Sequence, residues 1–335
     1  MKILLIGLLD EATGNATTLQ RIGKHLEGGG HQIVFLHSKN IHDRGSLLRF
    51  CTQEQCAAAL GIHAFGAGQY LRHLTVPTII VFGGTDLNED IQNPERLSVM
   101  TDAVIKATFL VTFNHDFTKR VQNFWPLCAH KTHCIPQGVH THPSGFSLRK
   151  KLHLSIEDIL FLLPAGIRKV KDPLYLAEMM VQWHREDPHI HLVIVGSNRD
   201  PIFAEKVRRK IEELSGITLL PPLPTEDLHA AMKEADAVLN TSHSECSPNG
   251  ILEAMALGTP VIARAIPGNT SIVKNNITGL IFSSPEEFQQ CATRLLNDTR
   301  LQRTLTTNAQ IYINEHHTIA IEQKAYQALI ASLTK

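Results

Sequence analysis

The chain has 335 residues, of which 43% are hydrophobic, and its 32 Lys and Arg residues balance its 32 Asp and Glu residues. This length and composition are those of a globular protein with room for two domains. The balanced charge excludes the basic surface with which proteins hold nucleic acid or anionic membranes, so no nucleic-acid partner is expected. No stretch approaches the ~20 consecutive apolar residues of a membrane helix, so we expect no membrane span.

The cysteines and asparagines indicate a cytoplasmic location. The six cysteines form no CxxC pair and no regular framework, which suits a reducing compartment. Glycosylation sequons occur at Asn15, Asn240, Asn269, Asn276 and Asn297. Two of them, Asn15 and Asn240, fall in or beside the expected ligand crevice, where a glycan would block it. The apolar residues 1–10 lack a small-residue cleavage site and lead into loop residues, as a first strand does.

The first half of the chain alternates apolar strands with helical patterns. Strands are predicted at residues 3–6, 32–36, 77–82 and 109–113, with a helix and a strand within 51–60. The first strand leads into a loop, residues 11–18, that contains Gly14, and then into a helix that ends near Gly28. This unit lacks the GxGxxG fingerprint of dinucleotide-binding proteins, so Gly14 on its own indicates a connecting turn.

The strand at residues 77–82 ends in Gly83-Gly84-Thr85-Asp86. Asp86 is therefore a polar group at the carboxyl end of a central strand, where α/β proteins bind ligands. The alternative is that Asp86 only caps the next helix.

The second half alternates strands and helices still more regularly. A polar stretch with Pro and Gly, residues 140–151, is typical of an interdomain linker. Strands are predicted at residues 159–163, 192–195, 218–220, 237–239, 261–263 and 280–282. Helical patterns lie between them, and a last helix is predicted at residues 319–333. This alternation favours an α/β fold with a parallel sheet and right-handed crossovers.

A basic loop follows the first strand of this second domain. Residues 164–173 contain Gly166, Arg168 and Lys171 just before a helix. The glycine allows close approach of the backbone, while Arg168 offers a bidentate fork and Lys171 a point charge to an anion. The alternative is that basic loop residues simply face water.

Two glutamates flank the start of another helix. Pro248 biases Ser247 away from helical angles, so a helix is predicted to begin near Asn249 or Gly250. Glu245 then lies on the loop after the strand at residues 237–239, with amides that could hold an anion beside it. Glu253 lies in the early turns of the helix, where a glutamate is also common because it complements the helix dipole.

The spacing of these glutamates resembles a known signature. Glu245, seven residues and Glu253, followed by Ala-Met-Ala-x-Gly-Thr-Pro-Val-Ile-Ala, resembles the donor site of the retaining glycosyltransferases of family 4. That resemblance implies the GT-B fold, in which two Rossmann-like parallel-sheet domains face each other across a crevice. It implies an acceptor-side domain at residues 1–145 and a nucleotide-sugar-binding domain at 152–315. Residues 316–335 would form a terminal helix that crosses back to the first domain.

The resemblance also implies roles for individual residues. Glu245 would be the catalytic carboxylate, Arg168 and Lys171 would hold the donor's diphosphate, and Glu253 would bind the ribose hydroxyls. Further donor contacts are expected from Asn249, Gly250 and Gly14, with possible ones from Asp86, Gly166 and Ser247. The expected partners are a uridine-diphosphate sugar and an unidentified acceptor, with retention of anomeric configuration. No metal or other cofactor is expected, because Arg168 and Lys171 can neutralise the diphosphate.

Two positions depart from the family pattern. Gly83 stands where the family has an active-site histidine, and Cys246 stands where a glycine usually follows the first glutamate. Cys246 could narrow the sugar pocket or only pack in the interior. The alternatives left open are a nucleotide-sugar epimerase, an enzyme that transfers sugar to a small seleno or thio anion, and a non-catalytic nucleotide-sugar-binding protein.

Overall fold

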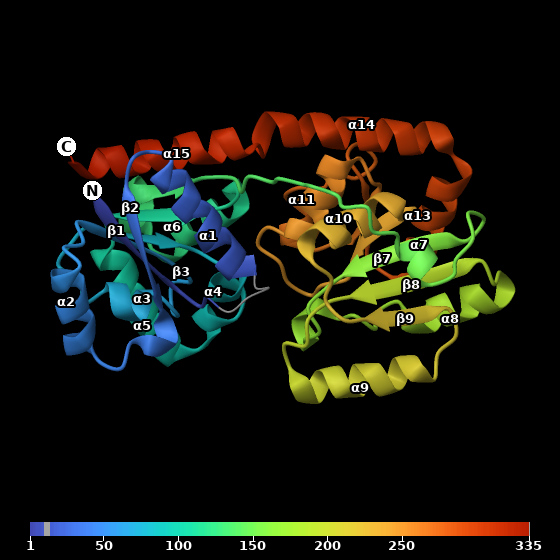
Figure 1. Ribbon diagram of the computed structural model, residues 1–335, viewed down its shortest axis with the longest axis horizontal. Helices are drawn as coiled ribbons and strands as arrows, with labels where there is room; N and C mark the ends of the chain where they lie inside the picture. Colours follow the sequence, from blue (N-terminus) through green and yellow to red (C-terminus); the bar gives the residue numbers. More distant parts are fainter. Residues whose placement is uncertain (10–13, 335) are drawn as a thin grey trace. The chain divides into compact units, whose positions relative to one another are not determined.

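The computed structural model describes residues 1–9 and 14–334, and the chain divides into two compact units. Unit 1 contains Met1–Gly138 and Ile319–Lys335, and unit 2 contains Val139–Thr318. Each unit is built around a six-stranded sheet in which every paired strand is parallel, with helices around it (Figure 1). The predicted α/β class is confirmed.

The sheet of unit 1 has the strand order β2-β1-β3-β4-β5-β6. Its strands are β1 Lys2–Gly7, β2 Gln32–His37, β3 Ala58–Ile62, β4 Thr78–Val81, β5 Phe109–Thr112 and β6 Thr132–Cys134. Its longer helices are α1 Gly14–Glu27, α2 Arg44–Gln53, α5 Pro94–Lys106, α6 His115–Phe124 and α15 Ile319–Ala331, with short helices α3 Gly68–Leu71 and α4 Gly84–Asn88. Residues 3–6 of β1 are fully buried, as an apolar strand covered on both faces requires.

The sheet of unit 2 has the strand order β12-β11-β10-β7-β8-β9. Its strands are β7 Ile159–Pro164, β8 Ile190–Val195, β9 Ile217–Leu220, β10 Ala237–Asn240, β11 Val261–Arg264 and β12 Leu280–Phe282. Its helices are α7 Leu148–Lys151, α8 Ala177–Glu186, α9 Pro201–Glu212, α10 Thr225–Glu234, α11 Asn249–Leu257, α12 Pro267–Thr270, α13 Pro285–Asn297 and α14 Thr299–His316.

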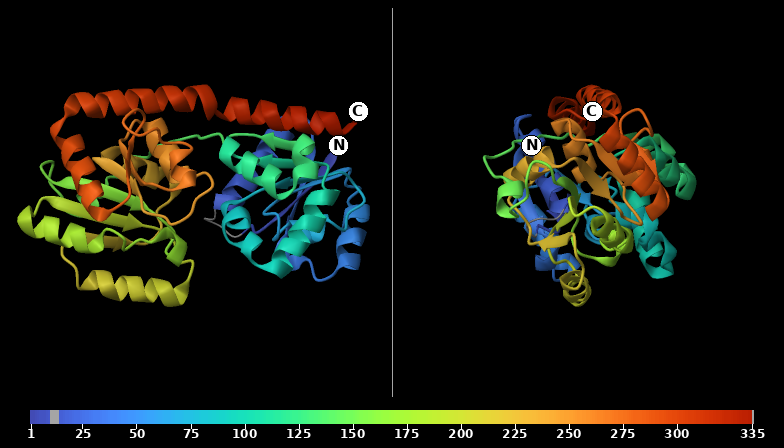
Figure 2. Two further views of the ribbon diagram at one scale, coloured as in Figure 1. Left: turned by 180° about the vertical axis from the view of Figure 1, so that it is seen from behind. Right: turned by 90° about the vertical axis from the view of Figure 1, so that its right-hand side faces the viewer.

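Alternating residues of β7 fill two separate cores, one on each face of the unit 2 sheet. Phe161 and Leu163 belong to the core that is covered by α8, α9 and α13. Leu160 and Leu162 belong to the core covered by α10, α11 and α14. The left view of Figure 2 shows one helix of each set, α9 in yellow below the sheet and α14 in red above it. The period of two along an extended strand explains why one apolar run serves both cores.

The predicted strands agree with the observed ones to within a few residues, and β6 is a strand that was not predicted separately. The boundary between the units lies at residue 138, whereas the sequence prediction put the end of the first domain at 145. Residues after Val139 belong to unit 2 because the Ser144 amide donates to the Glu226 carbonyl at 3.0 Å and the Ser144 hydroxyl donates to Asp227 at 2.6 Å.

The last helix, α15, packs on α1 within unit 1 (Figure 1). The fully buried Glu322 accepts from Arg21 Nε at 2.7 Å and lies 2.9 Å from His25 Nε2. Tyr326, one turn further on, is also fully buried. Among the described residues, no helix combines the length and hydropathy that a membrane span requires.

Candidate functional site

In unit 2 the loops that carry the predicted residues meet at the carboxyl ends of β7 and β10. These strands are neighbours, and the chain runs from β7 to β8 on one side but returns to β10 on the other. Such a reversal opens a crevice above the sheet, where α/β proteins bind ligands. The loop after β7 carries Arg168 and Lys171, and the loop after β10 carries Glu245.

The Glu245 carboxylate is the centre of this cluster. Its Oε1 atom accepts from Lys171 Nζ, from Ser242 Oγ at 2.7 Å and from Asn240 Nδ2 at 3.2 Å. Only 10% of the Glu245 side chain is exposed. Burial by itself raises the pKa of Glu245, but the Lys171 charge and the three hydrogen bonds outweigh it and hold that pKa below its usual value. Glu245 is therefore an ionised carboxylate at the crevice.

The backbone around Glu245 is fixed by a very close approach of α12. A Cβ atom at Gly268 would lie 2.3 Å from the Glu245 carbonyl oxygen, so only glycine fits there. The fully buried Asn269 donates from Nδ2 to Asn240 Oδ1 at 3.1 Å and to the Arg264 carbonyl at 2.9 Å. The Pro267-Gly268-Asn269 segment thus holds both the loop and the asparagine that contacts Glu245.

Arg264 is a site residue that the sequence analysis missed. It is the last residue of β11, and its Nη1 donates to Asp172 Oδ2 at 3.0 Å. Its guanidinium carbon lies 3.8 Å from the centre of the Tyr175 ring, and His243 Nε2 lies 3.0 Å from the same Asp172 oxygen. The signal that could have found Arg264 is its place at a strand end beside β10, the same rule that selected Glu245.

The remaining basic residue, Arg168, is exposed, and its side chain makes no hydrogen bond or ion pair with the described part of the chain. It is thus available to a ligand, whereas Lys171 is already paired with Glu245. Gly166 lies in the same loop. Gly196 after β8 was not predicted, although a Cβ atom there would lie 1.8 Å from the Ala165 carbonyl oxygen. The loops after β7 and β8 therefore touch through their backbones.

Helix α11 begins at Asn249, so the predicted helix start is confirmed. Pro248 is its N-cap residue with φ −74° and ψ 107°, and no side chain caps the helix. The Oγ atom of Ser247 is buried without a hydrogen-bond partner in the described structure. Gly250 is the second residue of α11. A Cβ atom added there would lie 3.2 Å from Pro164 Cγ, so the start of the helix lies directly against the end of β7.

Glu253 lies one turn into α11, and 22% of its side chain is exposed. Its Oε2 atom is 3.9 Å from Nε2 of the buried His229 on α10, and no closer polar contact is made with the described residues. Cys246 is 6% exposed, so its side chain packs in the interior.

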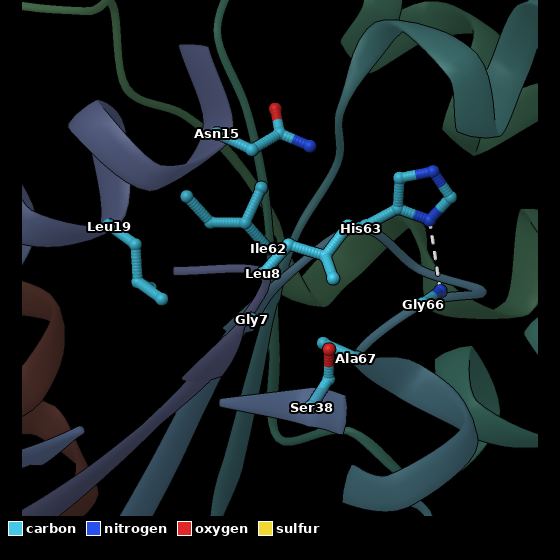
Figure 3. Close-up of a pocket in the computed structure, with 9 residues that line it drawn as sticks. All are labelled: Gly7, Leu8, Asn15, Leu19, Ser38, Ile62, His63, Gly66 and Ala67. Atoms are coloured by element: carbon cyan, nitrogen blue, oxygen red, sulfur yellow. Dashed lines mark hydrogen bonds between the residues drawn. The ribbon is translucent and has the colours of Figure 1, made fainter. Parts of the chain in front are cut away.

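Unit 1 contains a cavity of about 170 Å³ at the carboxyl ends of β1 and β3 (Figure 3). These strands flank the point where the strand order of this sheet reverses. Leu19 and Asn15 of α1 line one part of the cavity, and His63 and Ala67 after β3 line another. Gly14 is the first residue of α1, and residues 10–13 of the predicted glycine loop lie outside the described residues.

Asp86 is buried beside the cavity and pairs with His63, which the sequence analysis did not select. Its Oδ1 atom lies 2.7 Å from His63 Nδ1, and its Oδ2 accepts the Gly83 amide at 2.7 Å. Burial lowers the pKa of His63, but Asp86 and the nearby Asp90 outweigh it and raise that pKa above its usual value. The Gly66 amide also lies 2.9 Å from Nδ1 of His63 (Figure 3). The shorter, charge-assisted contact to Asp86 favours a proton on this nitrogen.

Among the described residues, one group of three side chains could offer ligand atoms to a metal ion. It consists of His63, Asp86 and Asp90. Arg96 Nη1 already lies 2.6 Å from Asp90 Oδ1, so arginine and histidine together balance the two carboxylates. This arrangement fits a buried ionic network better than a cation site. That the chain works without a metal stays a prediction.

Comparison with known proteins identifies relatives of both units. The family described as glycosyl transferases group 1 matches residues 146–312. The Glycosyltransferase 1 domain-containing protein 1 of Xenopus tropicalis is 41% identical over 340 residues, covering 99% of this chain and 98% of that protein. The D-inositol 3-phosphate glycosyltransferase of Salinispora arenicola is 28% identical over 173 residues, which span 48% of this chain and 39% of that enzyme.

Solved structures share the whole arrangement of elements. Anabaena HepE, solved in complex with UDP-glucose, has a TM-score of 0.81 at 16% identity and covers 99% of this chain and 100% of its own. The sucrose-phosphate synthase of Thermosynechococcus elongatus has a TM-score of 0.82 at 18% identity, with 99% of both chains covered. At this identity the likeness concerns the fold, and the predicted GT-B fold is confirmed.

Proposed function

The chain belongs to the glycosyltransferase group 1 family, and on that premise we propose that it transfers a sugar from a uridine-diphosphate sugar to a hydroxyl-bearing acceptor with retention of anomeric configuration. The observation that carries this proposal is the ionised Glu245, which lies at the crevice of unit 2 beside Lys171, with Arg168 on the same loop as Lys171. HepE, whose fold is similar, was solved with UDP-glucose, which supports a uridine-diphosphate donor.

The chemistry of sugar transfer explains why these charges are needed. The bond from the anomeric carbon to the diphosphate breaks, and the acceptor oxygen forms the new bond to that carbon while its proton passes to the leaving diphosphate. Negative charge grows on the diphosphate and positive charge on the anomeric carbon. The negative charge on the diphosphate would be stabilised by Arg168, Lys171 and the uncapped amides of α11. The positive charge on the anomeric carbon would be stabilised by the Glu245 carboxylate.

Lys171 can donate hydrogen bonds to Glu245 and to the donor's diphosphate at the same time. An ammonium group has three N–H donors, so it can keep its bond to Glu245 and still donate to a phosphate oxygen. No metal is needed under this proposal, because Lys171 and Arg168 supply the compensating charge. Glu253, which is partly exposed one turn into α11, would accept hydrogen bonds from the ribose hydroxyls.

We assign the acceptor to the cavity of unit 1. Three polar side chains line it, those of Asn15, Ser38 and His63, and the other lining residues are apolar or glycine. No Lys or Arg is among its described lining residues, and His63 is already paired with the Asp86 carboxylate, which favours an uncharged hydroxyl compound over a small seleno or thio anion. The six cysteines, which form no CxxC pair and no regular framework, support a cytoplasmic location.

A ligand panel followed by an activity assay tests the proposal. A uridine-diphosphate sugar at ~100 times its dissociation constant should stabilise the protein by roughly 2.7 kcal/mol, measured as a rise in melting temperature. If neither UDP nor any UDP sugar moves the melting temperature at millimolar concentration, the donor site is wrong. A protein that binds the sugar nucleotide but never hydrolyses or transfers it would be a binding protein, and formation of an epimer without acceptor would indicate an epimerase.

A further inference from the structure

His229 of α10 is buried and holds a polar atom with no hydrogen-bond partner. The residue is 2% exposed, and its Nε2 atom lacks a partner within the described structure. The nearest carboxylate oxygen is Oε2 of Glu253 on the adjacent helix α11, at 3.9 Å. A buried polar atom without a partner is uncommon, because it loses its bonds to water on folding.

The hydrogen of this imidazole can be placed on Nε2. The His142 amide donates to His229 Nδ1 at 3.1 Å, so Nδ1 provides a lone pair. In a neutral imidazole the other nitrogen then carries the proton. The unpartnered Nε2–H group is therefore a donor, and among the described residues Glu253 Oε2 is the nearest carboxylate oxygen to it.

The ring is held in this orientation by the segment that begins unit 2. The Ser144 amide donates to the Glu226 carbonyl at 3.0 Å and its hydroxyl to Asp227 at 2.6 Å, both in the first turn of α10. These bonds keep the His142 amide beside Nδ1 of the His229 ring. The imidazole is thus fixed, whereas the Glu253 carboxylate is partly exposed and can rotate.

We propose that His229 is a positioning residue for Glu253. When a nucleoside diphosphate binds, a shift of about 1 Å closes the 3.9 Å separation to an ordinary hydrogen bond from Nε2–H to Oε2. The other oxygen, Oε1, is then aimed at the ribose hydroxyls. A charged acceptor makes this bond a strong one, and a fixed donor lowers the cost of ordering the glutamate. This inference rests on the proposed ribose contact of Glu253.

Substitution of His229 by asparagine separates the positioning role from a purely structural one. In His229→Asn the shorter side chain can still accept the His142 amide through Oδ1, but it no longer reaches Glu253. The unligated variant should keep the melting temperature of the wild type to within a few degrees, and its affinity for UDP should fall roughly tenfold. With a UDP sugar as donor, KM should rise while kcat for hydrolysis is retained, because the ribose contact does not change during the reaction.

Two further comparisons test the route through Glu253. In Glu253→Gln, the change His229→Asn should cause a smaller additional loss of UDP affinity than it does in the wild type, since only an uncharged acceptor remains. For 2′,3′-dideoxyuridine diphosphate, wild type and His229→Asn should bind equally, since no ribose hydroxyls remain to be oriented. His184→Asn is the control, because it makes the same change at another partly buried histidine, whose Nδ1 lies 2.7 Å from the Ile190 carbonyl oxygen and which is far from α11 in sequence.

The possible failures are distinguishable. If wild-type protein does not bind UDP, the proposed function fails and this inference fails with it. If UDP binds and Glu253→Gln weakens it, but His229→Asn leaves affinity unchanged, the donor site stands and the positioning role is wrong. Additive losses in the double variant, or an equal loss toward the dideoxy nucleotide, would also overturn it, because His229 would then act on something other than Glu253.

Discussion

Two basic residues of one loop occupy different environments. Lys171 is paired with the nearly buried Glu245, while the Arg168 side chain is exposed. From the sequence alone they are equivalent ligands for a diphosphate, and neither is expected to matter for folding. The ion pair changes that expectation for Lys171, because a buried carboxylate that loses its cation is costly.

Arg168→Ala and Lys171→Ala should therefore differ in stability although both weaken nucleotide binding. Each should reduce the free energy of UDP binding by roughly 1.5–3 kcal/mol, measured by calorimetry. Arg168→Ala should leave the free energy of unfolding within about 0.5 kcal/mol, whereas Lys171→Ala should lower it by about 3 kcal/mol. The control is Lys171→Met combined with Glu245→Gln, which removes both charges and should recover stability but not binding. Equal stability of the two single variants would contradict the ion pair.

Glu245→Gln should reduce turnover more than donor binding. The carboxylate stabilises the transition state, in which positive charge develops at the anomeric carbon, more than it stabilises the bound donor. In Glu245→Gln, kcat should therefore fall by roughly 10²–10³-fold with little change in KM. Steady-state hydrolysis of the best donor measures both constants. Glu253→Gln is the matched comparison, with a higher KM and nearly unchanged kcat. Full turnover in Glu245→Gln would sink the proposed mechanism.

At the scale of elements, the site depends on how closely α12 approaches the loop after β10. Gly268 lies against the Glu245 carbonyl oxygen, and no side chain fits between them. This contact joins a short helix to the loop that carries the Glu245 carboxylate, so a shift of α12 moves Glu245 directly.

Gly268→Ala should lower both stability and activity. Forcing a Cβ atom to within 2.3 Å of a carbonyl oxygen requires the backbone to move, at a cost of roughly 1–3 kcal/mol. The matched control is Gly145→Ala, because nothing lies within 4 Å of a Cβ there, and its stability should be unchanged. Chemical denaturation and donor hydrolysis of both variants provide the measurements. If Gly268→Ala behaves like Gly145→Ala, the close approach does not exist in solution.

The docking of α15 on α1 should depend on pH through Glu322. Burial alone raises the pKa of Glu322, but His25 and Arg21 outweigh it and hold that pKa below its usual value. Because the folded pKa is the lower one, the carboxylate stabilises the protein above the ordinary pKa of glutamate. This contribution is lost as the pH falls below about 4 and through the folded pKa.

Glu322→Gln should therefore lower the free energy of unfolding by roughly 3–5 kcal/mol at pH 7. The reason is that Arg21 and His25 would then lie beside a neutral side chain in place of the buried carboxylate. The difference from wild type should shrink on acidification, measured as unfolding free energy against pH. Glu315→Gln is the control, since that side chain is 64% exposed on α14, and its effect should stay within about 0.5 kcal/mol. A difference that grows below pH 4 would contradict the sign of the shift.

At the scale of the whole molecule, unit 1 is built from two separate parts of the chain. Residues 319–335 join residues 1–138, while the residues assigned to the donor lie in unit 2, except Gly14 and the possible contact Asp86. Unit 1 therefore depends on the last residues of the chain for its packing, whereas unit 2 does not contain them.

A chain shortened to residues 1–318 should lose stability in unit 1 but keep most of its UDP affinity. Removal of α15 exposes the α1 face that packs against Glu322, Tyr326 and Ile330. Hydrogen exchange should show faster exchange in α1 and unchanged protection in the core strand β7. Calorimetry should give a UDP affinity within about threefold of wild type, a change of less than ~1 kcal/mol. Loss of protection in β7 would show that unit 2 does not hold its fold without α15.

The sequence by itself determined most of the local structure. Apolar runs such as residues 159–163 predict strands because a parallel strand is covered on both faces, and Pro248 predicts the start of α11 because it has no amide hydrogen. Strand ends also placed Glu245, Arg168 and Lys171 on loops where α/β proteins bind ligands. Each of these inferences uses only residues close together in the chain, whereas the grouping of the three residues at one donor site came from the resemblance to the glycosyltransferases.

The tertiary structure decided which side chains meet. Lys171 and Glu245 are 74 residues apart, and Arg21 and Glu322 are 301 apart. His63 beside Asp86 and His229 beside Glu253 likewise come from different elements. Periodicity and capping report the neighbours of a residue along the chain, whereas these pairs depend on the register and packing of whole elements. A histidine or lysine that is one of many in the sequence becomes specific only when packing buries it against a single partner.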